Sequence, residues 1–425
     1  MTFRVAIIKG VRTPFCKANG VFQDIEADDL GAIVVRELLE RTPIKKEEVD
    51  ELILGNVIQN TGNPARVAGV KGGLPIQCPA FTVNRNCASG MEAVVTAANQ
   101  IALGKSKIVF AGGMESMSHF PITFPDQMRK FLWGFSKAKT FSQKLSAIFS
   151  FRPSMLKPVI AQIDDPLCNL VMGQTAEIIS RELKVTRQEM DEFALLSQKR
   201  AFAAIKSGRF AEEIVPVPLP PKYDTMQLVD DGPRENQTLE ALAGLRAVFD
   251  PLTGQVTAGN SSQVTDGAAC LLLMSEEEAK KRKMDVLGFI TGSASVGLNP
   301  SRMGLGPIYA VSKLLHESGL KLDDIDLFEI NEAFAAQIVA LEKAFQSAEF
   351  CKNELGLDKP FGKIDRDKLN VNGGAVALGH PVGASGARII LTLLLELKHR
   401  KKKWGIATLC IGGGQGAAVL LEAAP

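Results

Sequence analysis

The chain has 425 residues, of which 46% are hydrophobic and 23% are charged, and its formal net charge is +2. These values predict a globular protein of two or three structural units with a large core, and the near-neutral charge gives no reason to expect binding to nucleic acid. The seven cysteines include no C-x-x-C pair, so we expect neither a disulfide framework nor a metal site.

The two ends of the sequence bear on where the protein works. The first letters, MTFRVAIIKG, predict a strand rather than a signal or transit peptide, and the last, LLEAAP, carry no peroxisomal tripeptide. The apolar run IILTLLL is too short to span a bilayer. We therefore expect a cytoplasmic protein, with or without peripheral membrane contact, or a mitochondrial matrix protein if the chain is a processed eukaryotic one.

Apolar runs typical of strands alternate with helical patterns along the whole chain. The predicted strands are residues 4–10, 51–58, 80–84, 107–113, 269–274, 326–330 and 405–410. The predicted helices are residues 28–41, 89–104, 309–319 and 385–398. This alternation predicts the α/β class.

The two ends of the chain resemble each other. CASG at 87–90 opens a predicted helix that leads to IVFAGG at 108–113, and GASG at 383–386 opens one that leads to IATLCIGGG at 406–414. Upstream, VDELILGN parallels IDLFEIN in the same order. These matches predict an internal duplication interrupted by a large insertion at about 120–250. In this scheme we expect Cys87 and Cys410 to occupy matching places of the two repeats.

Part of the insertion is strongly basic. Residues 127–163 contain seven Lys or Arg and no acidic residue, and apolar residues recur there at helical spacing. Such a basic amphipathic segment can bind an anionic membrane surface or a partner protein. The alternative is a solvated helix that covers an active site.

Four short motifs carry candidate chemistry. Cys87 lies at a predicted helix start, where the partial positive charge favours a thiolate; the alternative is a buried packing cysteine. His380 lies in the glycine-dense loop GGAVALGHPVGASGAR, a setting that can hold it against a ligand. Cys410 is followed by three glycines whose N–H groups could bind an oxyanion or merely form a turn. Asn331, in NEAFAAQ, is either a helix N-cap or a ligand for a water or substrate oxygen.

Together these motifs resemble those of the thiolase family. VNRNCASG resembles its nucleophile motif, NEAFA its asparagine motif, GGAVALGHPVGASGAR its histidine motif and CIGGGQG its second-cysteine motif. The resemblance implies an α/β fold of five layers, αβαβα, with two duplicated halves, an inserted loop domain and a dimeric or tetrameric assembly. The predicted bounds are 1–119 continued at 251–280 for the N-terminal half, 120–250 for the loop domain and 281–425 for the C-terminal half.

The resemblance also implies a role for each motif residue. Cys87 would be the nucleophile, His380 its base and Cys410 the second acid and base. Asn331, through a water, and His380 would form one oxyanion hole, and the N–H groups of Cys87 and Gly412 the other. The contacts to coenzyme A (CoA), which is a substrate and not a cofactor, would be Ser262, Phe249, Met172 and Arg234.

The implied reaction is the cleavage of 3-ketoacyl-CoA by CoA in fatty-acid β-oxidation. The insertion resembles that of the thiolase β-subunits of the trifunctional fatty-acid oxidation complex, which predicts a hydratase/dehydrogenase α-subunit and membrane contact through residues 127–157. Asn331 follows the general thiolase pattern, whereas those β-subunits often have histidine there. Two alternatives stay open: an acetoacetyl-CoA thiolase working in the condensing direction, and a non-catalytic lipid-binding or scaffold subunit.

Overall fold

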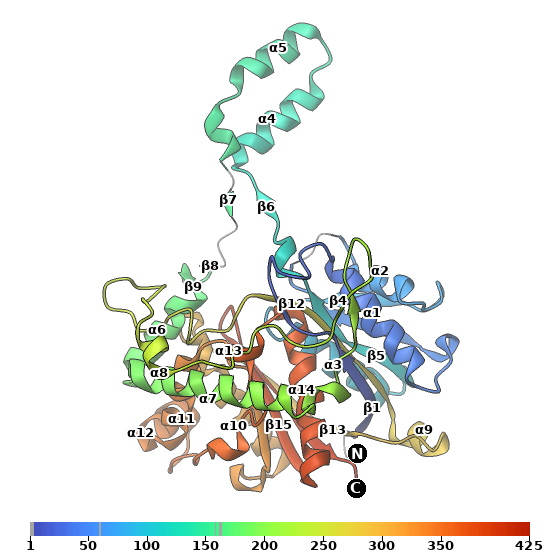
Figure 1. Ribbon diagram of the computed structural model, residues 1–425, viewed down its shortest axis with the longest axis vertical. Coiled ribbons are helices and arrows are strands. Elements are labelled where there is room, and N and C mark those ends of the chain that lie inside the picture. The colour runs from blue at the N-terminus through green and yellow to red at the C-terminus, as the bar shows by residue number, and fades with distance from the viewer. Residues whose placement is uncertain (1–3, 59–60, 158, 161–163) are drawn as a thin grey trace.

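The computed structural model describes residues 4–58, 61–157, 159–160 and 164–425, and Figure 1 gives its arrangement. The main feature is a ten-stranded sheet in the order β14-β15-β16-β13-β1-β12-β5-β3-β4, with β2 (Cys16–Lys17) paired to β12. The predicted strands and helices all form, with ends that differ by a few residues, so the mixed α/β fold is confirmed.

The N-terminal half of the sheet lies on one side of β1. Its strands are β1 (Val5–Arg12), β3 (Glu51–Gly55), β4 (Ala80–Val83), β5 (Ile108–Glu115) and β12 (Thr265–Ser275), and its helices are α1 (Ala27–Glu40), α2 (Pro64–Lys71), α3 (Ser89–Ala102) and α9 (Glu276–Lys281). Strands β4, β3 and β5 run parallel, whereas β12 pairs antiparallel with both β5 and β1.

The C-terminal half repeats this order of pairing. Its strands are β13 (Gly288–Gly297), β14 (Leu327–Ile330), β15 (Trp404–Ile411) and β16 (Gln415–Ala423), and its helices are α10 (Gly306–Ser318), α11 (Ala335–Gln346), α12 (Ala348–Leu355), α13 (Ala375–Leu378) and α14 (Val382–Arg400). Strands β14 and β15 are parallel, and β16 pairs antiparallel with β15 and β13. The halves join where β1 pairs antiparallel with β13.

A pair of aspartates fixes how the two halves correspond. Asp50 accepts hydrogen bonds from the N–H groups of Lys107 and Ile108 at 2.6 and 2.9 Å. Asp326 accepts from the N–H groups of the two residues that begin β15, Lys403 and Trp404, both at 3.0 Å. The same local device therefore joins β3 to β5 and β14 to β15, as a duplicated unit predicts.

This correspondence corrects the expected match between the two cysteines. When Ile108 is aligned with Trp404, Cys410 falls on Met114, and the CASG and GASG motifs align Cys87 with Gly383. The prediction that the cysteines occupy matching places was therefore wrong. It came from motif similarity without strand register, which a few letters cannot fix.

The two halves of the sheet are separated and flanked by three large clusters of buried apolar side chains in the described part of the chain. The middle cluster contains the apolar faces of α3 and α14 together with strand residues from both halves, a second packs α1 and α2 on the N-terminal half, and a third packs α10 and α11 on the C-terminal half. The order helix, strand, helix, strand, helix follows from these contacts.

Glycines allow the two middle helices to touch. A Cβ atom on Gly90 would lie 3.0 Å from the nitrogen of Ala387, and one on Gly386 would lie 2.3 Å from the nitrogen of Met91. Because the contacts are reciprocal, α3 and α14 cross at these glycines and bring their N-terminal ends close together. That crossing places Cys87 and His380 at the same part of the molecule.

Two helices of the inserted region pack against α11 and α13 of the C-terminal half. The region contains α6 (Met172–Glu182), α7 (Arg187–Lys206), α8 (Leu239–Ala243) and the short strands β8 (Asp164–Asp165), β9 (Leu170–Val171), β10 (Val217–Pro218) and β11 (Met226–Gln227). The domain bounds given above stay a prediction.

The basic segment forms a helical hairpin that stands away from the body (Figure 1). It consists of α4 (Asp126–Lys137) and α5 (Phe141–Ser150), reached through β6 (Ile122–Thr123) and β7 (Val159–Ile160). The predicted helical spacing is therefore confirmed over both helices, while residues 158 and 161–163 of the predicted 127–163 segment lie outside the described residues. The hairpin does not cover the body as a lid.

Candidate active site

Cys87 lies in a tight turn between β4 and α3. The preceding residue, Asn86, has a φ of 45°, a left-handed conformation that asparagine tolerates better than most residues. The Ser89 hydroxyl accepts a hydrogen bond from the N–H of Arg85 at 2.9 Å and donates one to the carbonyl of Asn86 at 2.7 Å. The turn thus holds the half-buried Cys87 two residues before the helix begins at Ser89.

The glycine turn after β15 lies against Cys87. The Asn86 side chain donates to the carbonyl of Gly412 at 2.8 Å, and the N–H of Gly412 hydrogen-bonds the Cys87 sulfur. Burial raises the pKa of the Cys87 thiol, and the N–H groups of Gly412 and Cys87 oppose that shift only in part. Cys87 therefore stays a thiol in the resting site, and a base must take its proton, as the expected pairing with His380 requires.

His380 is the group suited to accept that proton. Its Nδ1 lies 2.6 Å from the Ser385 hydroxyl, which itself donates to the carbonyl of Pro381 at 3.1 Å. A hydroxyl has one proton to give, so Nδ1 must carry its own hydrogen and Nε2 is left as the free base. Burial, together with the positive charge of Arg388, lowers the pKa of His380 to about 4, so the ring is neutral at pH 7.

Asn331 faces this imidazole. Its Nδ2 lies 3.5 Å from His380 Nε2, and its Oδ1 has no partner among the residues that the structure describes. Helix α11 begins at Ala335 with Phe334 as its N-cap, so the N-cap reading of Asn331 was wrong. A fully buried amide oxygen without a partner is unusual and fits a site that binds a ligand or water.

Cys410 lies near the end of β15 and is fully buried. Its sulfur donates to Oε1 of Gln337 at 3.3 Å. Burial raises the pKa of Cys410, and the charge of a Cys87 thiolate nearby raises it further. The two cysteines thus share one site, and Cys410 is a thiol at neutral pH.

Three of the four expected CoA contacts lie beside this site. A Cβ atom on Gly412 would lie 3.3 Å from the sulfur of Met172, and the ring of Phe249 fills the space that a Cβ atom on Gly173 would occupy. The N–H of Ser262 donates to the carbonyl of Ala333, two residues after Asn331, at 2.9 Å. These contacts bring Met172, Phe249 and Ser262 around the catalytic motifs.

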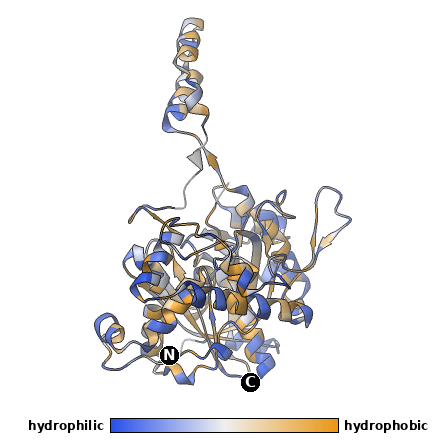
Figure 2. Cartoon of the chain, turned by 60° about the vertical axis from the view of Figure 1, so that its left-hand side comes forward, coloured by the Kyte–Doolittle hydropathy of each residue, from blue (hydrophilic) through white to orange (hydrophobic). Residues whose placement is uncertain are grey.

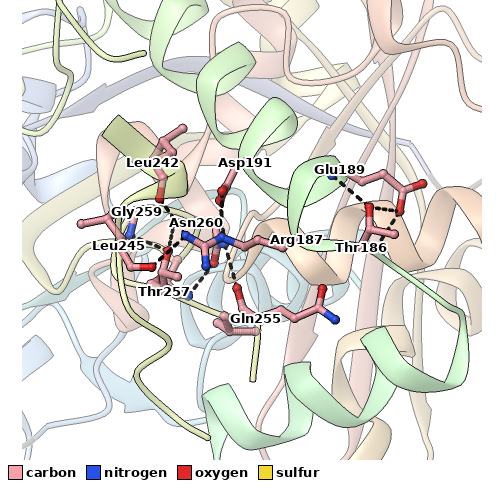
Figure 3. A network of polar contacts seen from close by, with 12 residues as sticks. Thr186, Arg187, Glu189, Asp191, Leu242, Leu245, Gln255, Thr257, Gly259 and Asn260 are labelled. Carbon is pink, nitrogen blue, oxygen red and sulfur yellow. Dashed lines mark hydrogen bonds and ion pairs between the residues drawn. The ribbon is translucent and has the colours of Figure 1, made fainter. Parts of the chain in front are cut away.

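A polar network supports the segment that carries Ser262 (Figure 3). Asp191 accepts from Asn260 Nδ2 at 2.9 Å and from Arg187 Nε at 2.7 Å. Arg187 also donates to the carbonyl groups of Leu242 and Leu245 at 2.7 and 3.0 Å. One buried carboxylate on α7 therefore ties the Ser262 segment to α8.

Arg234 lies apart from the cysteines. Its N–H donates to Gln198 Oε1 at 2.8 Å, and its exposed side chain lines an open pocket of about 490 Å³. The other residues that line this pocket are Glu235, Asn236, Gln237, Ala241 and Leu245. Gln198 also donates to the carbonyl of Val376, in the histidine motif, at 3.4 Å, so Arg234 is linked to that motif through Gln198.

Four residues of the site escaped the sequence analysis. They are Asn86, which holds the Gly412 turn; Ser385, which fixes the His380 tautomer; Gln337, which contacts Cys410; and Asp165, which accepts from the N–H of Gly413 at 2.7 Å. The first three stand inside the quoted motifs, where their positions gave a signal. Asp165 is remote in sequence and gave none.

Two kinds of feature are absent from the described residues, a metal-binding cluster and a membrane-spanning helix. Among them, no group of three or more His, Cys, Asp or Glu could hold a metal ion. No helix in the described ranges is long and apolar enough to cross a membrane.

Comparisons with known proteins agree with this geometry. Residues 5–277 match the family model of the thiolase N-terminal domain, and residues 284–423 match that of the thiolase C-terminal domain. Probable acetyl-CoA acyltransferases of Staphylococcus aureus (strain N315) and Staphylococcus epidermidis (strain ATCC 12228 / FDA PCI 1200) are each 40% identical, and the matches cover 99% of this chain and 99% and 98% of theirs.

Solved structures match over the full length as well. The acetyl-CoA acetyltransferase of Bacillus anthracis is 39% identical with a TM-score of 0.86, and the match covers 99% of each chain. Human mitochondrial 3-ketoacyl-CoA thiolase in complex with CoA is 35% identical with a TM-score of 0.84, covering 100% of this chain and 99% of that one. The chain therefore belongs to the thiolase family and is an acyltransferase.

Proposed function

We propose that the chain is a degradative 3-ketoacyl-CoA thiolase that works through an acyl-enzyme on Cys87. The observation that carries this proposal is the convergence of Cys87, the neutral base His380 and the thiol Cys410 on one site, with the N–H of Gly412 directed at the Cys87 sulfur. A nucleophile, a base and a separate acid are the groups that thiolytic cleavage needs.

In the first step, His380 Nε2 takes the Cys87 proton while the sulfur attacks the keto carbon of the substrate. The thiol alone is a poor nucleophile, and the raised pKa of Cys87 makes this proton transfer necessary. The N–H groups of Cys87 and Gly412 would stabilise the oxyanion that forms.

In the second step, the carbon–carbon bond breaks and its electron pair moves into the enolate of acetyl-CoA. His380, now protonated, and Asn331 through a water would stabilise the thioester oxygen; one such donor typically contributes about 10²–10³ in rate. Cys410 gives its proton to the departing carbon and becomes a thiolate. Within the Cys410 and His380 pair, the Cys410 thiolate then recovers a proton from His380, and His380 takes the proton of a second CoA thiol. The CoA sulfur takes the acyl group from Cys87, and the released Cys87 sulfur receives that proton from His380.

The CoA moiety would run from the catalytic site towards the inserted region. Met172, Phe249 and Ser262 would contact the pantetheine arm, and Arg234 with its open pocket would hold the nucleotide end, where its exposed guanidinium suits a phosphate. In this proposal CoA enters as a substrate, and the proton transfers are assigned to the side chains named above.

The substrate range separates the proposal from its main alternative. The same residues would serve an acetoacetyl-CoA thiolase working in the condensing direction, and the likeness to the Bacillus anthracis acetyl-CoA acetyltransferase keeps that candidate open. The helical hairpin favours the degradative assignment, because an enzyme of long-chain acyl esters gains from a position at a membrane surface.

The hairpin supports peripheral membrane contact. On α5, Phe141, Leu145, Ile148 and Phe149 share one helical face, and Phe141 and Phe149 are each 81% exposed. Trp133 on α4 is 64% exposed, and Figure 2 shows the hairpin projecting clear of the body. Apolar side chains interleaved with lysines suit an anionic lipid surface. We place the protein in the cytoplasm or matrix with this contact, and an α-subunit is the alternative occupant.

Sedimentation with vesicles tests this contact. The double variant Phe141→Ser/Phe149→Ser should lose binding to phosphatidylglycerol-containing vesicles, as should deletion of residues 127–157, with thiolysis retained. The matched control is Leu103→Ser, because Leu103 is 71% exposed elsewhere on the surface. Vesicle binding that depends neither on the charge of the lipid nor on these substitutions would contradict membrane contact through the hairpin. If the variants lose only co-purification with an α-subunit, the hairpin binds that partner instead.

The assembly would be a homodimer or a dimer of dimers. Strand β4 ends the sheet, and its residues are only half-buried in the single chain. An edge of that kind can pair with the same strand of a second copy. Sedimentation equilibrium on the wild type should return at least a dimer.

Thiolysis across a ladder of 3-ketoacyl-CoA esters, from acetoacetyl to long chain, tests the proposed function. Activity that rises with chain length supports degradation in β-oxidation. Activity confined to acetoacetyl-CoA would assign the condensing alternative, and absence of thiolysis on every ester would overturn both and favour a non-catalytic lipid-binding subunit.

A further inference from the structure

Gln337 is the polar neighbour of the proposed acid. It lies in the first turn of α11, is fully buried, and its Oε1 accepts from the Cys410 sulfur at 3.3 Å. The mechanism above uses Cys410 both as a thiol and as a thiolate. The side chain that contacts it must therefore be compatible with both states.

The stem of Gln337 is held in place by packing. A Cβ atom on Gly304, in the 3-10 helix Pro300–Leu305, would lie 3.4 Å from Cγ of Gln337, so a glycine there lets the side chain lie close to that backbone. The N–H of Gln337 donates to the carbonyl of Phe334 at 3.0 Å. With backbone and stem fixed, the terminal amide torsion is the one that stays soft.

The amide of Gln337 also has an unused hydrogen-bond donor. Its Nε2 is buried and has no hydrogen-bond partner among the described residues. A buried amide donor without a partner costs free energy, so it will bond to an acceptor that comes within reach. Rotation of the terminal torsion exchanges Oε1 and Nε2 in front of the Cys410 sulfur. Oxygen accepts from a thiol, whereas N–H donates to a thiolate.

We propose that Gln337 is a positioning residue that holds Cys410 in both protonation states, with its amide oxygen facing the thiol and its NH₂ group facing the thiolate. This inference rests on the proposed thiolase mechanism. During cleavage the S–H bond of Cys410 breaks, the new C–H bond of acetyl-CoA forms, and the electron pair stays on the sulfur. The amide turns as the charge appears.

Exchange of the methyl hydrogens of acetyl-CoA with deuterium oxide isolates this step. On acetylated enzyme, Cys410 first passes its proton to His380, and the resulting thiolate removes a proton from bound acetyl-CoA and returns a deuteron after exchange with the solvent. Gln337→Met, which keeps the length and removes the amide, should slow this exchange about tenfold to hundredfold. Acetylation of Cys87 by acetyl-CoA involves no proton transfer at carbon, and its rate should fall less than about threefold, within the effect of a mild repacking.

The matched control is Gln346→Met, on the exposed end of the same helix, which should leave both rates unchanged. Gln337→Glu adds a pH test with little change of volume. A neutral carboxyl can accept and donate, whereas an ionised one only accepts and repels a thiolate. Exchange by Gln337→Glu should therefore fall as pH rises through its carboxyl pKa, where the wild type does not fall.

The outcomes separate the inference from the function on which it rests. A wild type that neither acetylates Cys87 nor exchanges would overturn the proposed function itself. With an active wild type, equal losses of acetylation and exchange in Gln337→Met, or no loss of either, would overturn the role of Gln337. If Gln337→Met fails to fold, a Gln337→Glu profile with the wild-type pH dependence would do the same.

Discussion

The two halves of the molecule share a scaffold and differ in chemistry. Both begin with the same aspartate device, at Asp50 and at Asp326, and continue with the same order of strand pairing. Where the C-terminal half has Asn331 and Cys410, this register puts Gly55 and Met114 in the N-terminal half. One half therefore ends its strands in reactive groups and the other in packing residues.

The helix ends reverse that difference in part. The motif alignment that matches Cys87 with Gly383 also matches His380 with Asn84. The site thus takes its nucleophile from one half and its base, acid and asparagine from the other. Duplication supplies two equivalent helix ends close together, and the substitutions between them give each cysteine a separate role.

The largest expected effect follows from removing Cys87, the nucleophile that the N-terminal half contributes. Cys87→Ala should lower thiolysis by more than about 10⁴-fold, because no other group in the site can form the acyl-enzyme. The matched control is Cys351→Ala, a buried cysteine in α12 that contacts none of the catalytic residues described above, and this variant should stay active. Substantial turnover by Cys87→Ala would end the assignment of the nucleophile.

Removing the second cysteine should split the reaction. Cys410→Ala is expected to lose about 10²–10⁴ in thiolysis, the usual contribution of a positioned acid. It should retain acylation of Cys87 by acetyl-CoA much better than turnover. If the two rates fall together, the separate roles of the cysteines are wrong. Stopped-flow release of CoA and steady-state thiolysis supply the two rates.

A smaller loss is expected from the hydroxyl behind the base. Ser385→Ala removes the acceptor of the His380 Nδ1 hydrogen, so the free-base position of Nε2 is no longer fixed. We expect about a tenfold fall in kcat with KM nearly unchanged. Ser318→Ala, an exposed serine on α10, is the control. A fall confined to KM would contradict the tautomer argument.

His380 also links stability to pH. Its pKa is about 4 in the folded chain and close to 6.5 when unfolded, so the unfolded state binds more protons between these values. The stabilisation is full above about pH 6.5 and is lost as pH falls towards 4, by at most about 3 kcal/mol. The free energy of unfolding in urea, measured for the wild type and for His380→Asn across this pH range, should give a difference that changes with pH in this way. A difference that does not vary with pH would refute it.

Much of the fold could be read from the sequence because its signals are local. Alternating apolar runs and helical spacing predicted β1, β5, α1 and α14 to within a few residues. Strand register could not be read in this way, so Cys410 was matched with the wrong residue. Register depends on pairing between strands distant in sequence, as for β5 with β12.

The site was predictable where a motif carried the residue. Cys87, His380 and Cys410 stand in short distinctive strings, and the structure brings them together. For Asn331 the local pattern left a helix N-cap open beside a ligand role, and the N-cap is wrong because Phe334, three residues later, is the N-cap of α11. Asp165, which accepts from the N–H of Gly413, lies in β8, far away in the sequence, and the residues beside it form no motif that predicts this hydrogen bond.

The most direct test of the account is to locate the acyl group. The full chain is incubated with a 3-ketoacyl-CoA in the absence of free CoA, quenched in acid and digested, and the peptides are weighed by mass spectrometry. The account predicts an acyl group on the peptide that contains Cys87 and none on the peptide that contains Cys410. An acyl group on Cys410, or thiolysis with no acylated peptide, would contradict it.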